Sequence, residues 1–379
     1  MSGANESQPG VCVVTHPLSS SGENATRTLL NILSAVTTVS LVTADLPKDS
    51  TIRENHTVVE VTDASAGQAS VLTAAYRFLR NQFRMAHAIA QRHEDIVLFF
   101  GASSYVIPVV CAKLLGKTVA IEPRGDVPLT LKLNWEKRYP VTVASALSGV
   151  VSSLETFCYR LADGVITYTP SMAEELELDN YSHKLYPWGA RYVDVDEFDV
   201  QQPYDDRELI VGFIGRLDEE KNVRTLLRVA ELLPDHIKFR FIGDGPLRSE
   251  LERCADSERI SFTGWVDHDD VPSELNKLRL LILPSSPTEG LPTTILESLA
   301  CGTPVFATPV SGVPDVVQHR KTGFLIRSME PAEIADDISS IISRKDITTV
   351  SSQGRELVET EYDFCGAVDR YRTILDELG

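Results

Sequence analysis

The sequence predicts an α/β protein built on parallel sheets, with helices on both faces of each sheet. Short apolar runs alternate with helical stretches in the first half of the chain, and the order strand, loop, helix returns in the second half. This alternation is typical of parallel sheets, because parallel strands are joined by crossovers that usually contain a helix. The chain has 379 residues, of which 43% are hydrophobic, so it is long enough for two domains with cores of their own.

Five apolar runs in the first half are expected to be strands, at 11–15, 39–42, 96–100, 118–122 and 163–167. Helical spacing begins near Thr26, spans Val71–Arg92 and Tyr105–Leu115, and begins again at Pro170. The loop 16–24, between the first strand and the first helix, is rich in serine and contains Gly22. Such a loop can present backbone amides to a phosphate, although less permissively than a pair of glycines.

The second half opens with the apolar run 209–214, which is expected to be a buried strand. The loop 215–221 follows it, and Asn222 is a plausible N-cap for a helix that carries apolar residues at helical spacing. Arg216 and Lys221 therefore lie between the carboxyl end of a strand and the amino end of a helix. They can clamp a diphosphate there. The alternative is that they are surface residues paired with neighbouring acids, namely Asp218, Glu219 or Glu220.

The segment Glu289–Glu297 places two carboxylates eight residues apart, across a turn and the start of a helix. It follows the apolar strand 280–284, and ligands bind at this edge of an open α/β sheet. Pro292 suits the first helical position, and the amides of Gly290 and Leu291 can receive an anion. Carboxylates accept hydrogen bonds from sugar hydroxyls, so a sugar nucleotide fits the segment. The alternative is two ordinary glutamates, one in a loop and one on a solvated helix face.

Together with the motifs above, five further motifs follow the 209–214 strand in a fixed order: Gly243-Asp244-Gly245-Pro246, Phe262–Val266, Gly302–Val305, Gly312–Asp315 and Thr322–Leu325. The ordered set over residues 209–326 resembles the carboxy-terminal domain of a retaining GT-B glycosyltransferase of the large family 4 type (glycosyl transferases group 1), which carries a Glu-x7-Glu motif. The resemblance implies two Rossmann-like domains, with parallel sheets facing a central cleft. It also implies a C-terminal helix that crosses back to the first domain.

The resemblance implies three catalytic residues. Arg216 and Lys221 would bind the donor diphosphate and stabilise the leaving group, and Glu289 would contact the donor sugar near the reacting carbon. Glu297 would hydrogen-bond the ribose hydroxyls, and Val266 would lie beside the base. The remaining donor-binding positions are the backbone of the glycine turns and of the helix start: Gly215, Gly243, Gly245, Gly290, Leu291 and Pro292.

The polar and acidic stretch 194–207 indicates a domain boundary. We therefore expect an acceptor-binding domain at 1–200, a donor-binding domain at 201–363 and a final helix at 364–379. In this helix Val368, Tyr371, Ile374 and Leu375 have the spacing of one apolar face.

The amino-terminal half departs from the family pattern in two loops. Many relatives have paired glycines where this chain has the serine-rich loop with Gly22. Many also have His-Gly where this chain has Arg124-Gly125. Arg124 is expected to bind the donor diphosphate or an acceptor phosphate. The alternative is a structural arginine paired with Asp126 or Glu122.

The net charge is −18, and only 11 of the 36 basic residues are lysines. Few lysines and many acids suggest a halophilic protein, since high salt screens the self-repulsion; the alternative is an ordinary acidic protein. The acidity argues against nucleic-acid binding, which needs a basic face. No cofactor or metal is expected. No Asp-x-Asp is positioned as a convincing metal site, and the one formed by Asp194 and Asp196 lies in the linker.

The six cysteines are scattered, without a Cys-x-x-Cys pair, and the amino terminus lacks a signal pattern. Both features favour a cytoplasmic protein with buried free thiols. In residues 127–159, Lys132, Lys137 and Arg138 are interleaved with Leu, Trp135 and Tyr139. This segment either contacts an anionic membrane surface or packs as an ordinary loop and helix on the first domain.

The expected reaction is sugar transfer from a nucleotide-diphospho-sugar to a hydroxyl of a glycan or lipid-linked acceptor, with retention. The expected setting is the biosynthesis of a cell-surface glycan, a lipid-linked oligosaccharide or a glycoprotein. Two other classes are weighed against it. A sugar-nucleotide epimerase shares the fold but not the ordered motifs, and a catalytically silent relative would only bind a partner. The presence of Arg216, Lys221, Glu289 and Glu297 argues against the silent relative.

Overall fold

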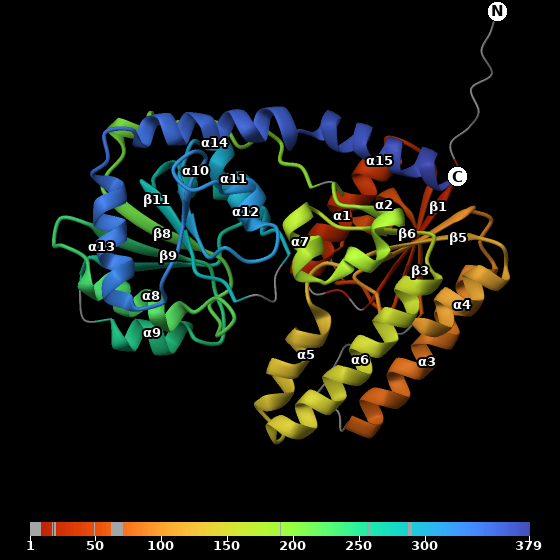
Figure 1. The fold of residues 1–379 in the computed structure, drawn as a ribbon. Coiled ribbons are helices and arrows are strands. Elements are labelled where there is room, and N and C mark those ends of the chain that lie inside the picture. Colours follow the sequence, from red (N-terminus) through yellow and green to blue (C-terminus); the bar gives the residue numbers. More distant parts are fainter. Residues whose placement is uncertain are drawn as a thin grey trace, which may run out of the picture. The chain divides into compact units, whose positions relative to one another are not determined.

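The computed structural model describes residues 9–16, 18, 20–48, 50–61, 71–189, 191–255, 258–286 and 290–379 (Figure 1). The chain forms two compact units. The first is Met1–Arg191 with Ala367–Gly379, and the second is Tyr192–Gly366. Each unit contains one parallel sheet flanked by helices, so the predicted α/β class is confirmed. The boundary between the two units falls after Arg191, whereas the sequence analysis predicted a domain boundary after residue 200.

The first unit has a seven-stranded sheet in the order β3-β2-β1-β4-β5-β6-β7, in which all described pairings are parallel. Its strands are β1 (Val11–Thr15), β2 (Val39–Thr43), β3 (Thr57–Glu60), β4 (Ile96–Phe100), β5 (Thr118–Glu122), β6 (Gly164–Ile166) and β7 (Leu185–Tyr186). β1 and β4 are buried along their whole length, which explains why their sequences are continuous apolar runs. The strand order reverses between β1 and β4, where α/β proteins bind ligands at the carboxyl edge.

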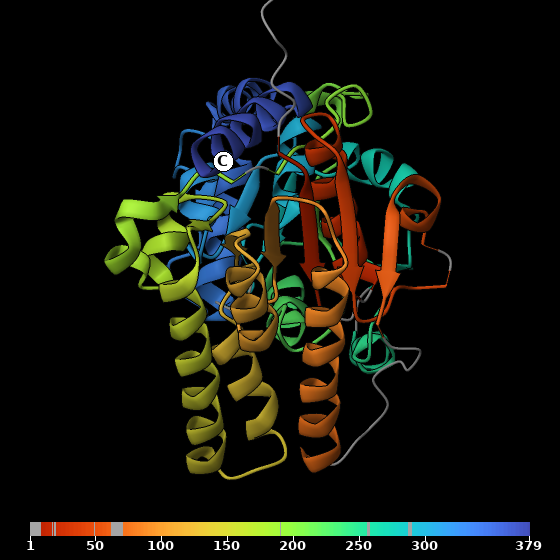
Figure 2. The same ribbon diagram turned by 90° about the vertical axis from the view of Figure 1, so that its right-hand side faces the viewer.

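The helices of the first unit connect these strands. They are α1 (Ser20–Ser34), α2 (Ile52–Asn55), α3 (Val71–Ala90), α4 (Val106–Leu114), α5 (Val127–Glu136), α6 (Val141–Leu161) and α7 (Pro170–Glu175), with a 3-10 helix η1 (Leu178–Lys184). In both views α3, α5 and α6 extend away from the sheet, and their free ends point the same way (Figures 1 and 2).

α1 begins at Ser20, six residues before the predicted start near Thr26. Gly22 therefore lies in the first turns of a helix and not in a loop, and its carbonyl accepts a hydrogen bond of 2.9 Å from Thr26 Oγ1. Glu23 explains the early start, because an acid in the first turn interacts favourably with the helix dipole. A hydrogen bond of 3.0 Å from Ser50 Oγ fixes this carboxylate.

The second unit has a six-stranded parallel sheet in the order β10-β9-β8-β11-β12-β13. Its strands are β8 (Ile210–Ile214), β9 (Lys238–Ile242), β10 (Ile260–Gly264), β11 (Leu280–Leu283), β12 (Val305–Ala307) and β13 (Phe324–Leu325). Its helices are η2 (Tyr204–Asp206), α8 (Val223–Leu232), α9 (Arg248–Cys254), η3 (His268–Asp270), α10 (Val271–Asn276), α11 (Thr293–Ala300), α12 (Val313–Val316), α13 (Pro331–Ile342) and α14 (Ile347–Glu361). Its order again reverses at the first and fourth strands, β8 and β11, which places the expected donor loops at the switch point.

The final helix, α15 (Phe364–Leu378), returns to the first unit from Ala367 onward. Val368, Tyr371, Ile374 and Leu375 are buried, as their spacing predicts. Leu378 lies against β6, since a Cβ on Gly164 would come within 2.7 Å of its Cδ2. The six cysteines are free, but Cys254 and Cys365 are exposed, so burial of all the thiols was a wrong prediction.

Candidate active site

The loop after β8 carries Arg216 and Lys221 at the carboxyl edge of the second sheet. Asp218 organises this loop. Its Oδ1 accepts a hydrogen bond of 3.2 Å from the Lys221 amide, and its Oδ2 lies 3.4 Å from Arg216 Nε. The Arg216 side chain is nevertheless 71% exposed. An exposed ion pair of this kind contributes little stability, so an anionic ligand can replace Asp218 as the partner of Arg216.

The β8 loop is joined to the loop that follows β11. Asn222 is the N-cap of α8, as predicted, but it adopts a left-handed conformation (φ 51°) and makes no side-chain cap. Its amide instead donates to the Pro284 carbonyl at 2.7 Å and to Ser286 Oγ at 3.5 Å. The Ser286 amide in turn donates to the Glu220 carbonyl at 2.9 Å. The two loops at the switch point therefore form one hydrogen-bonded structure.

The turn after β9 packs directly beneath the β8 loop. A Cβ on Gly243 would lie 2.1 Å from the Gly215 carbonyl oxygen, and one on Gly245 would lie 2.4 Å from that of Leu217. Gly243 also has φ +129°, which L side chains rarely adopt. These glycines are required because the two backbones approach so closely. Val266 follows β10 on the same edge and is half-buried.

The helix α11 supplies the other predicted donor contacts. It begins at Thr293, and Pro292 is its N-cap, one residue earlier than the first helical position that the sequence predicts for this proline. The first backbone amide of the helix therefore belongs to Thr293. Gly290 and Leu291 are buried in front of it. Glu289 lies outside the described residues.

Glu297 lies in the second turn of α11 and is only 7% exposed. The alternative of a solvated helix face is therefore excluded for this residue. Carboxylate oxygens accept several hydrogen bonds, so Glu297 can bind the hydroxyls of a ligand at this edge of the sheet. Ser285 is a further candidate that the sequence analysis missed. Its buried Oγ has no hydrogen-bond partner among the residues described, and only its place after β11 signals a role.

Arg124 lies at the carboxyl edge of the first sheet, in the loop after β5. Its side chain packs against Gly101, where a Cβ would lie 2.9 Å from Arg124 Cδ, and its guanidinium lies 5.2 Å from the Phe100 ring centroid. The predicted alternative partners are engaged elsewhere. Asp126 caps α5 by accepting from the Leu129 amide at 2.7 Å, and Glu122 accepts from Tyr371. No ion pair joins Arg124 to either acid, all three residues being described.

His16 follows β1 and lies beside the same glycine, with its Cε1 3.4 Å from the position of a Gly101 Cβ. Burial, together with the nearby charge of Arg124, lowers the pKa of His16 to about 4, so this imidazole is neutral at pH 7. Burial also lowers the pKa of Arg124. Tyr168 and Glu122 stabilise the charged guanidinium in part, but no ion pair within the described residues neutralises it, so an anionic ligand is favoured there. The sequence gives no sign of this grouping, because the residues come from three separate strand ends.

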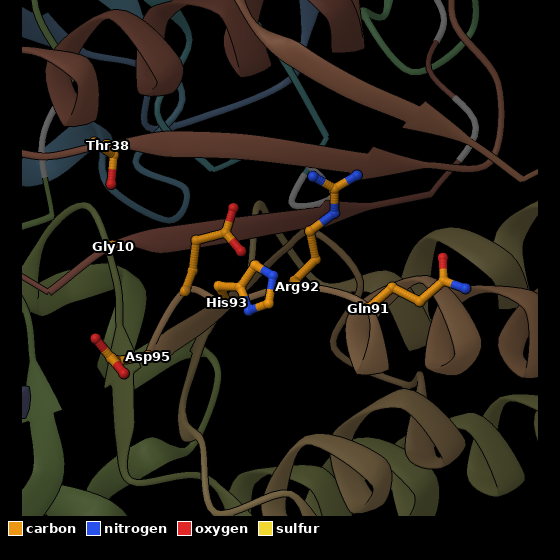
Figure 3. A pocket seen from close by; sticks show the side chains of 7 residues that line it. Gly10, Thr38, Gln91, Arg92, His93 and Asp95 are labelled. Atoms are coloured by element: carbon orange, nitrogen blue, oxygen red, sulfur yellow. The ribbon is translucent and has the colours of Figure 1, made fainter.

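Two pockets lie at the opposite edges of the sheets. One, of about 310 Å³, is lined by residues that precede β1, β2 and β4, including Gly10, Thr38 and Glu94 (Figure 3). The other lies beside Arg207, ahead of β8. Both are at amino ends of strands, away from the loops described above, so we assign them no part in donor binding.

Comparison with known proteins identifies the family to which these loops belong. Residues 208–344 match the family model of glycosyl transferases group 1. The chain is a GT-B glycosyltransferase of this group. It is therefore an enzyme of the transferase class, as the sequence predicted, and the alternative of a silent binding protein is not supported.

Two curated relatives and one solved structure illustrate the similarity. The α-D-kanosaminyltransferase of Streptomyces kanamyceticus is 24% identical over 79% of this chain and 81% of its own length. The sulfoquinovosyl transferase SQD2 of Arabidopsis thaliana is also 24% identical, over 73% of this chain and 54% of its own length. The crystal structure of Anabaena Alr3699/HepE in complex with UDP has a TM-score of 0.74 at 16% identity, and it covers 97% of this chain and 99% of that one.

Proposed function

We propose that this enzyme transfers a sugar from a nucleotide-diphospho-sugar to an acceptor hydroxyl, with retention of the anomeric configuration. The observation that carries the proposal is the single hydrogen-bonded structure formed by the β8 and β11 loops. It holds Arg216 and Lys221 on the same edge as the amino end of α11. Two cationic side chains and a helix amino terminus together suit a diphosphate.

In the proposed reaction, the bond between the anomeric carbon and the diphosphate oxygen breaks as the acceptor oxygen bonds to that carbon from the same face. Arg216, Lys221 and the α11 amides stabilise the negative charge that develops on the diphosphate. The leaving phosphate oxygen takes the proton of the acceptor hydroxyl, so the protein needs no separate base. Glu297 binds the ribose hydroxyls, and Val266 lies beside the base. Glu289 contacts the sugar.

In the first unit, we propose that Arg124 binds a phosphate of the donor or acceptor. The support is its desolvated guanidinium and the engagement of Asp126 and Glu122 with other groups. Gly22, in the first turns of α1, can contribute a helix-terminal amide. We further propose a cytoplasmic enzyme that acts on a glycan or lipid-linked acceptor. It requires no metal, because side chains and amides provide the positive charge.

The test is thermal stabilisation of the purified protein by a panel of nucleoside diphosphates and sugar nucleotides, in high salt. A ligand that binds only the folded state raises the melting temperature, by an amount that grows with its concentration over its Kd. We expect a selective shift with one nucleoside diphosphate, lost in Arg216→Ala and Lys221→Ala. Arg224→Ala is the matched control, because this arginine on α8 pairs with Glu219 and Glu250.

A folded protein that responds to no nucleotide contradicts the proposal. So does an equal shift in Lys221→Ala and in the Arg224→Ala control. Once the donor is known, the anomeric proton coupling in the NMR spectrum of the product decides between retention and inversion.

A further inference from the structure

The helices α3, α5 and α6 carry apolar side chains that no other part of the described chain covers. α5 has no buried residue, and α6 has four among its 21 residues. The exposed apolar residues of α3, of α5 and of the amino-terminal half of α6 are Tyr76, Leu79, Phe83, Leu133, Val141, Val143 and Val150. We call this set the projecting apolar surface. Single exposed apolar residues are ordinary, but a set of this size on neighbouring helices indicates a binding surface.

The helix α3 shows how this surface is organised. Tyr76, Leu79 and Phe83 are spaced i, i+3, i+7, so they form one stripe, and Tyr76 and Phe83 are each 64% exposed. Each of these residues is directly followed by an exposed arginine, so Arg77, Arg80 and Arg84 form a second stripe beside the first. The opposite face is buried in the first unit. An apolar stripe beside a basic stripe is typical of helices that lie at a lipid interface.

The charge of these helices is opposite to that of the whole chain. α3 carries three arginines and no acid, and residues 127–161 carry four basic residues and two acids. One of those acids, Glu155, is buried and hydrogen-bonded to Ser103. The chain as a whole has a net charge of −18. Positive charge is thus concentrated beside the projecting apolar surface, which matches an anionic partner.

The helix α6 is long and apolar enough to cross a membrane by length and composition alone. Its carboxyl half, however, is part of the core of the first unit, where Cys158 and Tyr159 are buried and Glu155 is hydrogen-bonded. Withdrawing this half into a bilayer would expose the core beneath it. The packing therefore favours a helix that rests on a membrane with its first turns and does not span it.

We propose that the projecting apolar surface docks on an anionic lipid bilayer. Its apolar side chains enter the headgroup region, while Arg77, Arg80, Lys137 and Arg138 contact lipid phosphates. Trp135 and Tyr139, both half-buried at the end of α5, have the amphipathic rings that favour this interface. The proposal does not depend on the donor site, since vesicle binding needs neither nucleotide nor turnover.

The experiment is co-sedimentation of the full chain with vesicles of phosphatidylcholine, with and without phosphatidylglycerol, at low and high salt. We expect binding to the anionic vesicles that weakens as salt rises, because screening reduces the attraction between charges. Leu79→Glu should weaken binding about tenfold, as the loss of one buried leucine implies. Arg80→Gln should weaken it about fivefold.

Two control variants match these changes on the second unit. Leu232 on α8 is 55% exposed against 50% for Leu79, so Leu232→Glu should leave vesicle binding unchanged. Arg253→Gln serves the same purpose for Arg80→Gln, since both arginines are exposed. Circular dichroism of all four variants checks that they are folded.

The proposal is overturned if the folded wild-type chain binds neither kind of vesicle at low salt, or if Leu79→Glu and Leu232→Glu bind equally well. A second copy of this chain is the other occupant to exclude. If the wild type is a dimer by light scattering, and Leu79→Glu is a monomer without any change in vesicle binding, the surface is a dimer interface and the lipid proposal fails.

Discussion

Tyr371 Oη donates a hydrogen bond of 2.6 Å to Glu122 Oε2, and both side chains are fully buried in the first unit. The two residues lie 249 positions apart in the sequence. Glu122 ends β5, two residues before Arg124, and Tyr371 is on the final helix α15. The bond therefore attaches the final helix to the end of β5, and the loop that follows β5 contains Arg124, the candidate phosphate-binding residue.

Replacing Tyr371 with Phe should lower the free energy of unfolding by about 1–3 kcal/mol, since it leaves a buried carboxyl group with one hydrogen bond fewer. Glu122 Oε1 already lacks a hydrogen-bond partner within the described residues, so the variant leaves this carboxyl group without the one hydrogen bond that it accepts from them. Urea unfolding measures the change. Tyr76→Phe is the control, because that side chain is exposed, and equal stabilities of the two variants would contradict the role of the bond.

Glu122 also predicts a pH dependence of stability. Burial raises its pKa from 4.5 to about 7, although Tyr371 and the nearby arginines lower it in part. The unfolded state then ionises at lower pH than the folded state. The contribution of Glu122 to stability is therefore full below about pH 4.5, and it is lost as the pH rises to about 7.

Glu122→Gln removes this titration and keeps an oxygen that accepts from Tyr371. We expect the variant to gain stability relative to the wild type between pH 5 and pH 8, by up to about 3 kcal/mol. Urea unfolding at several pH values measures the difference between the two proteins. Burial also raises the pKa of Glu155 to about 7. Because Glu155 is present in both proteins, its effect on stability cancels in the difference between them. A difference that stays constant over this range would contradict the prediction.

Much of the fold follows from local sequence. Strands such as Ile96–Phe100 are buried on both faces, so they appear as uninterrupted apolar runs, and loops that carry Gly243 and Gly245 need glycine for close backbone approach. Both signals are local. The same reasoning placed Arg216 and Lys221 on the edge where the structure has them.

Contacts between distant segments could not be predicted in this way. The grouping of His16, Gly101 and Arg124 depends on which strands are neighbours, and periodicity does not encode that. The start of α1 at Ser20 was missed because Ser and Gly have weak helix propensity, and a contact from Ser50 to Glu23 helps to hold the first turn. The sequence also suggested a solvated alternative for Glu297, which is buried.

Arg207 is buried and should be essential for stability, not for turnover. Its guanidinium donates to Thr303 Oγ1 at 2.6 Å and to the Cys301 carbonyl at 2.7 Å, among other acceptors. Arg207→Met should lower the free energy of unfolding by about 3 kcal/mol or more, because these buried acceptors lose their donor. Urea unfolding measures the loss, with the exposed Arg253→Met as control. A stability equal to that of the control would show that water or other groups replace the guanidinium.

The charge at the donor site predicts turnover without a divalent metal. Once the donor and an acceptor are identified, the rate should be unchanged, within experimental error, when the enzyme is treated with excess chelator and assayed in chelator. The physical reason is that, in the proposed site, Arg216, Lys221 and the α11 amides provide the positive charge that neutralises the leaving diphosphate. Loss of activity in chelator, with full recovery on addition of Mg²⁺ or Mn²⁺, would contradict this prediction.

Asn222 offers the sharpest test of the proposed donor site, because its side chain joins the β8 and β11 loops without being placed on the substrate. Asn222→Gly keeps the left-handed backbone conformation, which glycine adopts readily, and removes only the hydrogen bonds to Pro284 and Ser286. We expect kcat/KM to fall about tenfold or more, since displacement of Arg216 and Lys221 relative to α11 weakens transition-state stabilisation. The affinity for the nucleoside diphosphate should fall with it, as measured by calorimetry.

The control is Gly116→Asn, which makes the reverse change at a left-handed position on the first unit. The added Cβ meets open space there, so kcat/KM should be unchanged. A variant Asn222→Gly with the kcat/KM of the wild type would show that the two loops hold their positions without this link.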